Sequence, residues 1–178
     1  MDFDDFEIRR ALVGDVETLA ALGARTFRDA YLEQSDPEDV EDYVASNFNP
    51  ARIAEQVSDT DTLFLLAGVG GQPVGYAKLR MGLAPACVRG PKPLELARLY
   101  LDQRVIGRGH GRALMRACLD EAVRLGCETM WLGVWEQNLR ARRFYENWGF
   151  RQVGTHEFIF GGRAYDDPVL ARPVRDEG

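Results

Sequence analysis

A stretch rich in glycine and arginine is the part of the sequence best suited to bind a charged ligand. It reads LYLDQRVIGRGHGRALM over residues 99–115. Its small and basic residues are Gly107, Gly109, Gly111, Arg104, Arg108 and Arg112. Glycines let the backbone approach a ligand closely and adopt positive φ. A helix that begins here directs unpaired N–H groups and partial positive charge to the same place. The stretch predicts an anion site, and we favour a phosphate-bearing ligand over a purely structural turn.

Two familiar phosphate-binding loops do not fit this turn. A dinucleotide-binding fold carries its glycine fingerprint in the first strand–helix unit, whereas this turn follows four expected strands. A nucleotide-binding P-loop needs Lys followed by Ser or Thr after its last glycine, and Arg112 and Ala113 stand there. A different kind of phosphate ligand is therefore expected.

The turn and a second segment together resemble one known family. NLRARRFYENWGF at residues 138–150 is similar to the N-x-x-A-x-x-F-Y-x-x-x-G-F segment of the GNAT superfamily of acyl-CoA-dependent N-acetyltransferases. The family's pyrophosphate loop has the pattern Gln/Arg-x-x-Gly-x-Gly/Ala. Gly109 and Gly111 occupy its two small positions, while Ile106 departs from the first, and a frame that starts at Arg104 also fits the letters. The stretches LELARLYL, WLGVWEQN and GTHEF more narrowly resemble PaiA-type polyamine N-acetyltransferases.

The resemblance implies a fold and a reaction. The fold is the α/β GNAT fold, a mixed, mostly antiparallel sheet of about seven strands with a splayed parallel pair, flanked by about four helices. A single domain over residues 1–178 is expected. The reaction is direct transfer of an acetyl group from acetyl-CoA to a primary amine, without an acyl-enzyme. Acetyl-CoA is thus the expected co-substrate.

The resemblance also implies which residues form the site. Tyr145 would be the general acid that reprotonates the CoA thiolate, because a phenol with an ordinary pKa of about 10 is protonated at neutral pH. Trp135 and His156 would line the acceptor site. The strand end, the glycine turn and one asparagine would hold the coenzyme: Leu99, Tyr100, Leu101, Gly107, Arg108, Gly109, His110, Gly111, Arg112 and Asn138.

Several of these roles have a structural alternative. Glu95 is the candidate base, acting on the amine through water, because strand alternation places it on one face with Leu99. It is equally interpretable as a solvated or salt-bridged residue, with Arg98 as partner. Tyr145 is alternatively a packing residue with a satisfied hydroxyl. His156 is interpreted as structural in preference to a proton relay.

Helices and strands that must position these residues are expected along the whole chain. A helix capped by Asp15 is expected to run to Ala30, and a second one to begin with Asp36 as its cap and Pro37 in its first turn. Two further helices are expected at 112–125 and 139–148. Strands are expected at 7–12, 62–69, 73–81, 94–101, 130–135, 150–160 and 164–171, the last two forming a hairpin around Gly161 and Gly162.

Composition limits the classes of partner. The chain has 178 residues, a formal net charge of −6 and three cysteines without a CxxC pair. The acidic balance argues against nucleic acid, and no apolar run approaches the length that crosses a bilayer. The acidic start MDFDDFEIRR lacks the order of a signal peptide. A reducing cytoplasm is expected, and no metal site is expected from two histidines.

The acceptor is expected to be a small primary amine, with a polyamine favoured. The acidic residues at 33–42 suit either helix capping and solubility or a wall that attracts an amine. The first rival is an N-terminal protein or ribosomal-protein acetyltransferase, and the second a non-catalytic acyl-CoA-binding regulator. Phe158 and Phe160 are open to two interpretations, a hairpin contact or a homodimer contact.

Overall fold

A seven-stranded mixed sheet organises the chain, for which a computed structural model describes residues 5–175. The strand order is β1-β2-β3-β4-β5-β7-β6. The strands are β1 Phe6–Arg10, β2 Thr62–Val69, β3 Gln72–Met81, β4 Pro93–Leu101, β5 Thr129–Gly133, β6 Arg151–Phe160 and β7 Arg163–Pro173. The expected α/β fold with its parallel pair is confirmed. The first four residues of the acidic start lie outside the described part.

Contacts within the chain define two compact units. The first extends to Leu79 and includes Arg98–Cys118, and the second comprises Arg80–Ala97 and the chain from Leu119 onward. Strands β3 and β4 and helix α4, which spans His110–Arg124, therefore contribute residues to both units.

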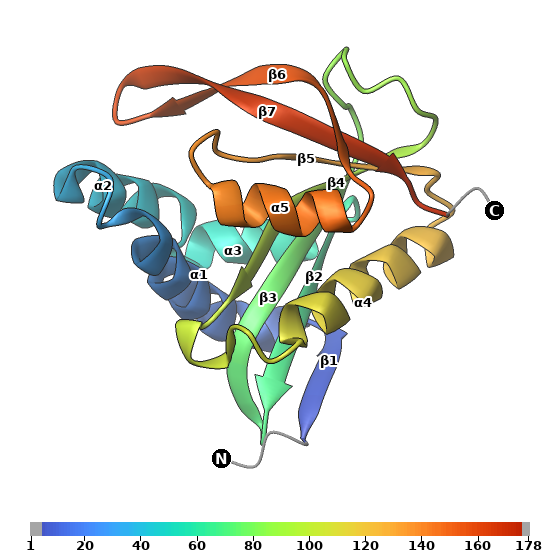
Figure 1. The fold of residues 1–178 in the computed structure, drawn as a ribbon. Coiled ribbons are helices and arrows are strands. Elements are labelled where there is room, and N and C mark those ends of the chain that lie inside the picture. Colours follow the sequence, from blue (N-terminus) through green and yellow to red (C-terminus); the bar gives the residue numbers. More distant parts are fainter. Residues whose placement is uncertain (1–4, 176–178) are drawn as a thin grey trace. The chain divides into compact units, whose positions relative to one another are not determined.

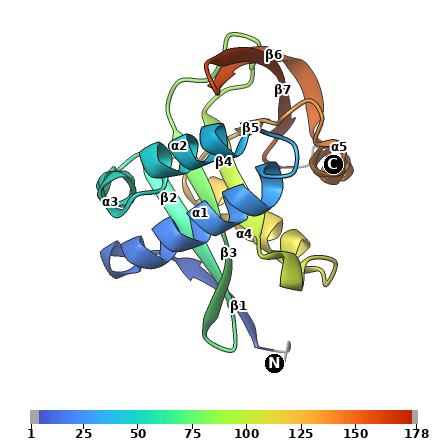
Figure 2. The ribbon, with the colours of Figure 1, turned by 90° about the vertical axis from the view of Figure 1, so that its left-hand side faces the viewer.

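The first unit buries β2 on both of its faces. Every residue of β2 from Phe64 to Val69 is buried, as a strand between two covering layers requires. Figure 2 shows helix α1, Val16–Tyr31, crossing one face of β2 and β3. One cluster joins α1, α3, β2 and β3: Leu19, Ala20, Leu22, Ile53, Phe64, Leu66 and Tyr76.

Two of the first unit's helices begin with a capping residue followed by proline, and the start at Asp36 and Pro37 is the expected one. Asp36 accepts a hydrogen bond from the Glu38 N–H at 2.9 Å and starts α2, Pro37–Asn47. Asn49 caps α3, Pro50–Ser58, in the same way. Helix α3 was not among the expected elements, although Asn49 before Pro50 is a helix-start signal.

Asp15 is the N-cap residue of α1, as expected, but it makes no side-chain capping hydrogen bond. The Asp15 side chain makes no hydrogen bond to α1 and closes the short 3-10 turn η1, Val13–Asp15, by accepting the Leu12 N–H at 2.7 Å. It also binds the Arg9 guanidinium at 2.8 Å. Arg9 competes for the carboxylate, so the residue fixes the strand-to-helix turn instead of the helix end.

The second unit contains a parallel pair and a long hairpin. In the parallel register, β4 and β5 pair Leu94 with Met130 and Glu95 with Trp131. Strands β6 and β7 form the expected hairpin (Figure 1), and both turn glycines have positive φ, 59° and 70°, as tight hairpin turns require. Helix α5, Leu139–Asn147, lies beside this hairpin (Figure 2). The Arg172 guanidinium on β7 donates to the Trp148 carbonyl at the end of α5.

Two classes of feature are not found in the described part of the chain. Within residues 5–175, no helix has the length and apolarity that crossing a membrane would take. The same residues include no group of three or more His, Cys, Asp or Glu side chains placed to hold a metal ion.

Candidate functional site

The glycine turn of the first unit has the backbone of an open anion-binding loop. Gly107 and Gly109 have φ of 84° and 85°, a conformation that other residues adopt at a cost. A Cβ added at either position would meet no atom within 4 Å. Helix α4 begins at once with His110. The Arg112 N–H already donates to the Gly109 carbonyl at 3.1 Å, so the earlier amides are the ones left for a ligand.

Asp102 fixes the strand end before this loop. Its carboxylate accepts hydrogen bonds from Arg104 Nε at 3.0 Å and Arg104 Nη2 at 2.7 Å, and from Arg25 at 3.1 Å. The hydrogen bonds from Arg104 lower the pKa of Asp102 to about 2, against the opposing effect of burial. The charge of Arg104 is therefore compensated locally. Arg108 and Arg112 are the other two arginines of the turn.

His110 turns its side chain into the first unit. The imidazole stacks on Phe6 with ring centroids 4.2 Å apart and is 8% exposed. Its Nε2 atom is buried and has no hydrogen-bond partner among the described residues. Any part that His110 plays at the glycine loop therefore falls to its backbone N–H.

The end of β4 presents its side chains to two different clusters. Tyr100 packs on the α1–α3 side, and Leu101 packs on the other side with Val69, Val74 and Val105. Burial raises the pKa of Tyr100. The side chains of Tyr100 and Leu101 are thus packed in the core, so any contact of these two residues with a ligand falls to their backbone.

Arg98 is not the partner of Glu95. Its guanidinium lies over the Phe48 ring, 4.4 Å from the centroid, as a cation–π pair. In the second unit, Arg80 takes the expected place, because Arg80 Nε donates to Glu95 Oε2 at 2.8 Å. Glu95 is thus salt-bridged, with Arg80 in place of Arg98 as its partner, and its role as the base stays a prediction. Strands β3 and β4 place this pair, and the Glu95 side chain remains 14% exposed.

Helix α5 carries Asn138 and Tyr145. Asn138 is the N-cap, because its side-chain oxygen accepts the Ala141 N–H at 3.1 Å. Tyr145 is 9% exposed and meets Phe144 and Phe150 edge to face, at centroid distances of 5.5 Å and 5.7 Å. These rings fix the orientation of the phenol, while the capping role leaves the Asn138 amide nitrogen for a ligand.

The end of β5 holds the His156 ring. A Cβ on Gly133 would lie 2.4 Å from His156 Nε2, so a side chain at this position would displace the imidazole. Trp131 meets the imidazole at 6.4 Å with ring planes at 89°. Trp135 follows β5 and is half-buried. Among the expected acceptor residues, His156 is therefore placed at the end of β5 by direct contact.

A carboxylate that the sequence interpretation missed lies opposite His156. The β6–β7 register pairs His156 with Asp167. Asp167 is 7% exposed, and its Oδ1 atom has no hydrogen-bond partner among residues 5–175. Burial raises the pKa of Asp167, and the nearby His156 acts in the opposite direction by lowering it. The hairpin signal could have revealed it, because a two-residue turn at Gly161 and Gly162 fixes which residues face each other.

Comparisons with known proteins identify the family. The sequence pattern of the Acetyltransferase (GNAT) family matches residues 24–150. An uncharacterized N-acetyltransferase of Mycobacterium tuberculosis is 38% identical over 161 residues, covering 90% of this chain and 98% of its own length. The chain belongs to the GNAT family of acetyltransferases, and it is an acetyl-CoA-dependent N-acetyltransferase.

More distant relatives have assigned acceptors. A spermine/spermidine N(1)-acetyltransferase of Bacillus subtilis is 31% identical over 91 residues, 49% of this chain and 59% of its own. The N-alpha-acetyltransferase RimI of Mycobacterium tuberculosis is 30% identical over 128 residues, 71% of this chain and 76% of its own. The solved PaiA N-acetyltransferase of Thermoplasma acidophilum, in complex with coenzyme A, has a TM-score of 0.77 at 23% identity over 94% of this chain and 98% of its own. That last likeness shows the fold.

Proposed function

We propose that the protein acetylates a primary amine of a small molecule, with a polyamine as the favoured acceptor. The observation that supports acetyl-CoA as the acetyl donor is the open loop of positive-φ glycines at the start of α4. On the acceptor side, the partial likeness to the Bacillus subtilis spermine/spermidine enzyme supports a polyamine. The acidic residues of α2, Glu38, Asp39 and Asp42, add negative charge suited to a cationic acceptor.

The residues present fit the coenzyme. The backbone amides of Gly107–Gly111 would bind its pyrophosphate, because helix N-termini favour anions. The guanidinium groups of Arg108 and Arg112 would add charge at the same place. The backbone of 99–101 would pair with its pantetheine arm, and the Asn138 amide nitrogen would donate to that arm. Acetyl-CoA supplies an acetyl group activated as a thioester.

Two side chains would move the protons. The Glu95 carboxylate would accept, through water, the proton that the acceptor ammonium must lose before its nitrogen can attack. Arg80 holds this carboxylate in place. The Tyr145 hydroxyl would donate a proton to the departing thiolate, and its aromatic neighbours keep the phenol oriented. Trp135 and His156 would line the acceptor side.

A second candidate acceptor is a protein N-terminus. The likeness to RimI covers more of this chain than the likeness to the spermine/spermidine enzyme, and it favours this alternative. We also propose a cytoplasmic location, since none of the three cysteines forms a disulfide, which suits a reducing compartment. A homodimer through Phe158 and Phe160 stays a prediction.

A competition between acceptors tests the function. Release of free thiol from acetyl-CoA is measured with spermidine, an amino sugar and a peptide with a free N-terminus. The proposal expects spermidine to give the highest kcat/KM. A peptide that outperforms every small amine would favour the second candidate instead.

A further inference from the structure

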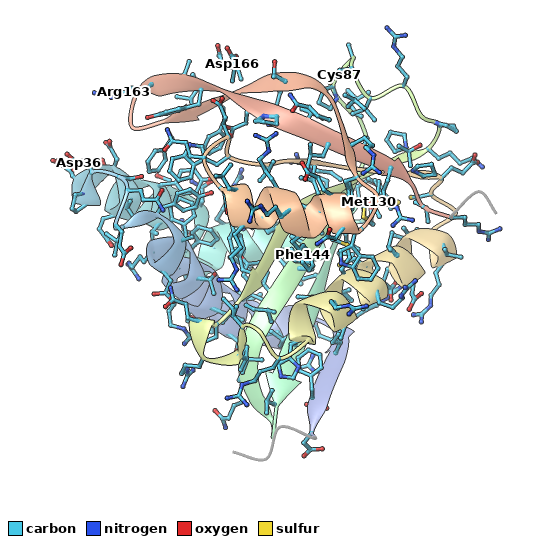
Figure 3. All side chains as sticks on the ribbon, viewed as in Figure 1. Asp36, Cys87, Met130, Phe144, Arg163 and Asp166 are labelled. Atoms are coloured by element: carbon cyan, nitrogen blue, oxygen red, sulfur yellow. The ribbon has the colours of Figure 1, made fainter. Side chains whose placement is uncertain are left out.

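The inner face of the β6–β7 hairpin combines a carboxylate with aromatic rings. The register sets His156 opposite Asp167 and Phe158 opposite Tyr165, and directly opposed residues share a face of the sheet. These four residues are buried or half-buried, whereas the pair between them, Glu157 and Asp166, is exposed. Figure 3 shows Asp166 on the outer side of the hairpin. The inner face of the hairpin is therefore suited to contact a ligand or the protein core, whereas the outer face is exposed to solvent.

Asp167 stands out on this inner face because its carboxyl group is buried and incompletely hydrogen-bonded within the described residues. It is 7% exposed, and Oδ1 has no hydrogen-bond partner among the described residues. Buried polar atoms nearly always have a partner, and an unpaired one costs free energy. A protein retains such an atom at a cost to its stability. A ligand that donates a hydrogen bond to Oδ1 would offset this cost.

The charges around Asp167 select a cation as that ligand. From its own strand Asp166 adds negative charge, and so does Glu136 from the segment after β5. The Glu136 backbone N–H and His156 on β6 act in the opposite direction. With two further carboxylates nearby, the surroundings attract a positive group and repel an anion. Aromatic rings on the same face suit an alkylammonium chain, through its methylenes and through cation–π attraction.

We propose that Asp167 binds an ammonium group of the acceptor other than the one that is acetylated. This inference rests on the proposed function. The nitrogen that attacks a thioester must be neutral, whereas an ammonium held by a buried carboxylate stays protonated. The acceptor is therefore a diamine or polyamine that reacts at one nitrogen and is held at another.

Two amines with the same four-carbon chain test this role. We compare kcat/KM for 1,4-diaminobutane and butylamine, which differ by the second ammonium. The wild type should prefer the diamine at least tenfold, and Asp167→Asn should lower that ratio at least tenfold while changing the butylamine value less than threefold. Glu157→Gln is the matched control, because it removes one carboxylate charge from the outer face of the same hairpin. It should change the ratio less than twofold.

Binding and stability measurements separate the possible failures. Calorimetry should detect 1,4-diaminobutane binding to the wild type, with affinity at least tenfold weaker in Asp167→Asn and Asp167→Ser. Asp167→Asn should also keep or raise the Tm, because it removes a buried charge. If wild type and variants acetylate amines with the same diamine-to-butylamine ratio of kcat/KM and bind 1,4-diaminobutane equally well, the role of Asp167 is overturned. A wild type that binds the diamine but acetylates neither amine would overturn the proposed function and leave the binding role supported.

Discussion

Arg80 and Glu95 form a salt bridge between neighbouring strands, with Arg80 Nε 2.8 Å from Glu95 Oε2. Arg80 is 53% exposed, while Glu95 is 14% exposed. The arginine therefore orients a mostly buried carboxylate at the point where the pairing of β4 with β5 ends, at Glu95 and Trp131. This geometry suits a carboxylate that receives a proton through a water molecule.

The first prediction concerns Glu95. Replacing it by glutamine keeps the shape and removes the proton acceptor, so kcat should fall about 100-fold, the lower end of general-base effects. The dissociation constant of acetyl-CoA, measured by calorimetry, should stay within twofold. Arg80→Gln is the companion variant and should lower kcat less, since it removes only the orienting partner. A Glu95→Gln enzyme with unchanged kcat would exclude Glu95 as the base.

Tyr145 gives the second prediction. Tyr145→Phe keeps the ring and its contacts with Phe144 and Phe150 but removes the proton donor. We expect kcat to drop by at least tenfold, with acetyl-CoA affinity nearly unchanged. Single-turnover measurements of thiol release would separate this chemical step from product release. Loss of coenzyme affinity at constant kcat would instead indicate that the hydroxyl serves packing or binding.

The third prediction uses the backbone of the glycine loop. Gly109 has φ of 85°, and a side chain in that region costs about 1 kcal/mol or more. Gly109→Ala should therefore distort the loop and weaken acetyl-CoA binding at least tenfold. Gly70→Ala is the matched control, because Gly70 also has positive φ, 54°, in a hairpin turn that has no part in the proposed site. Equal coenzyme affinity in both variants would contradict the role of the loop.

The fourth prediction concerns Asp102 and pH. The folded state lowers the pKa of Asp102 from 3.8 to about 2, mainly through hydrogen bonds from Arg104. The ionised carboxylate therefore stabilises the fold above pH 4, and this contribution is lost as the pH falls through about 2. Asp102→Asn should reduce the free energy of unfolding by about 1–2 kcal/mol at pH 7.

Urea unfolding across pH tests this assignment. The stability difference between wild type and Asp102→Asn should shrink steadily between pH 4 and pH 2. Asp120→Asn, at an exposed position of α4, is the control and should show no such trend. A difference that is constant with pH would mean that Asp102 acts through packing instead of charge.

Local signals in the sequence were sufficient for most of the fold. Asp36 before Pro37 and the glycine pair at 161–162 each mark a boundary by chemistry that acts within a few residues, and the structure has α2 and the hairpin there. Helix α3 was missed although Asn49 and Pro50 provide the same kind of signal. The family likeness supplied the order of the parallel pair, which local patterns do not determine.

Long-range pairs in the candidate site were not accessible in this way. Asp102 meets Arg25, 77 residues earlier in the chain, and Glu95 meets Arg80 instead of the nearby Arg98. Such partners depend on which strands become neighbours. The position of Asp167 could have been predicted from the sequence, because the turn at 161–162 determines that it faces His156. Counting the register outward from a tight turn is thus a practical way to find cross-strand residues.

The central claim is that this enzyme transfers an acetyl group from acetyl-CoA to a small amine with more than one ammonium group. The most direct measurement is the rate of thiol release from acetyl-CoA with spermidine and with a peptide bearing a free N-terminus, with the acetylated product identified by mass spectrometry. We predict singly acetylated spermidine and a kcat/KM at least tenfold above that of the peptide. Faster acetylation of the peptide, with no acetylated spermidine formed, would contradict the claim.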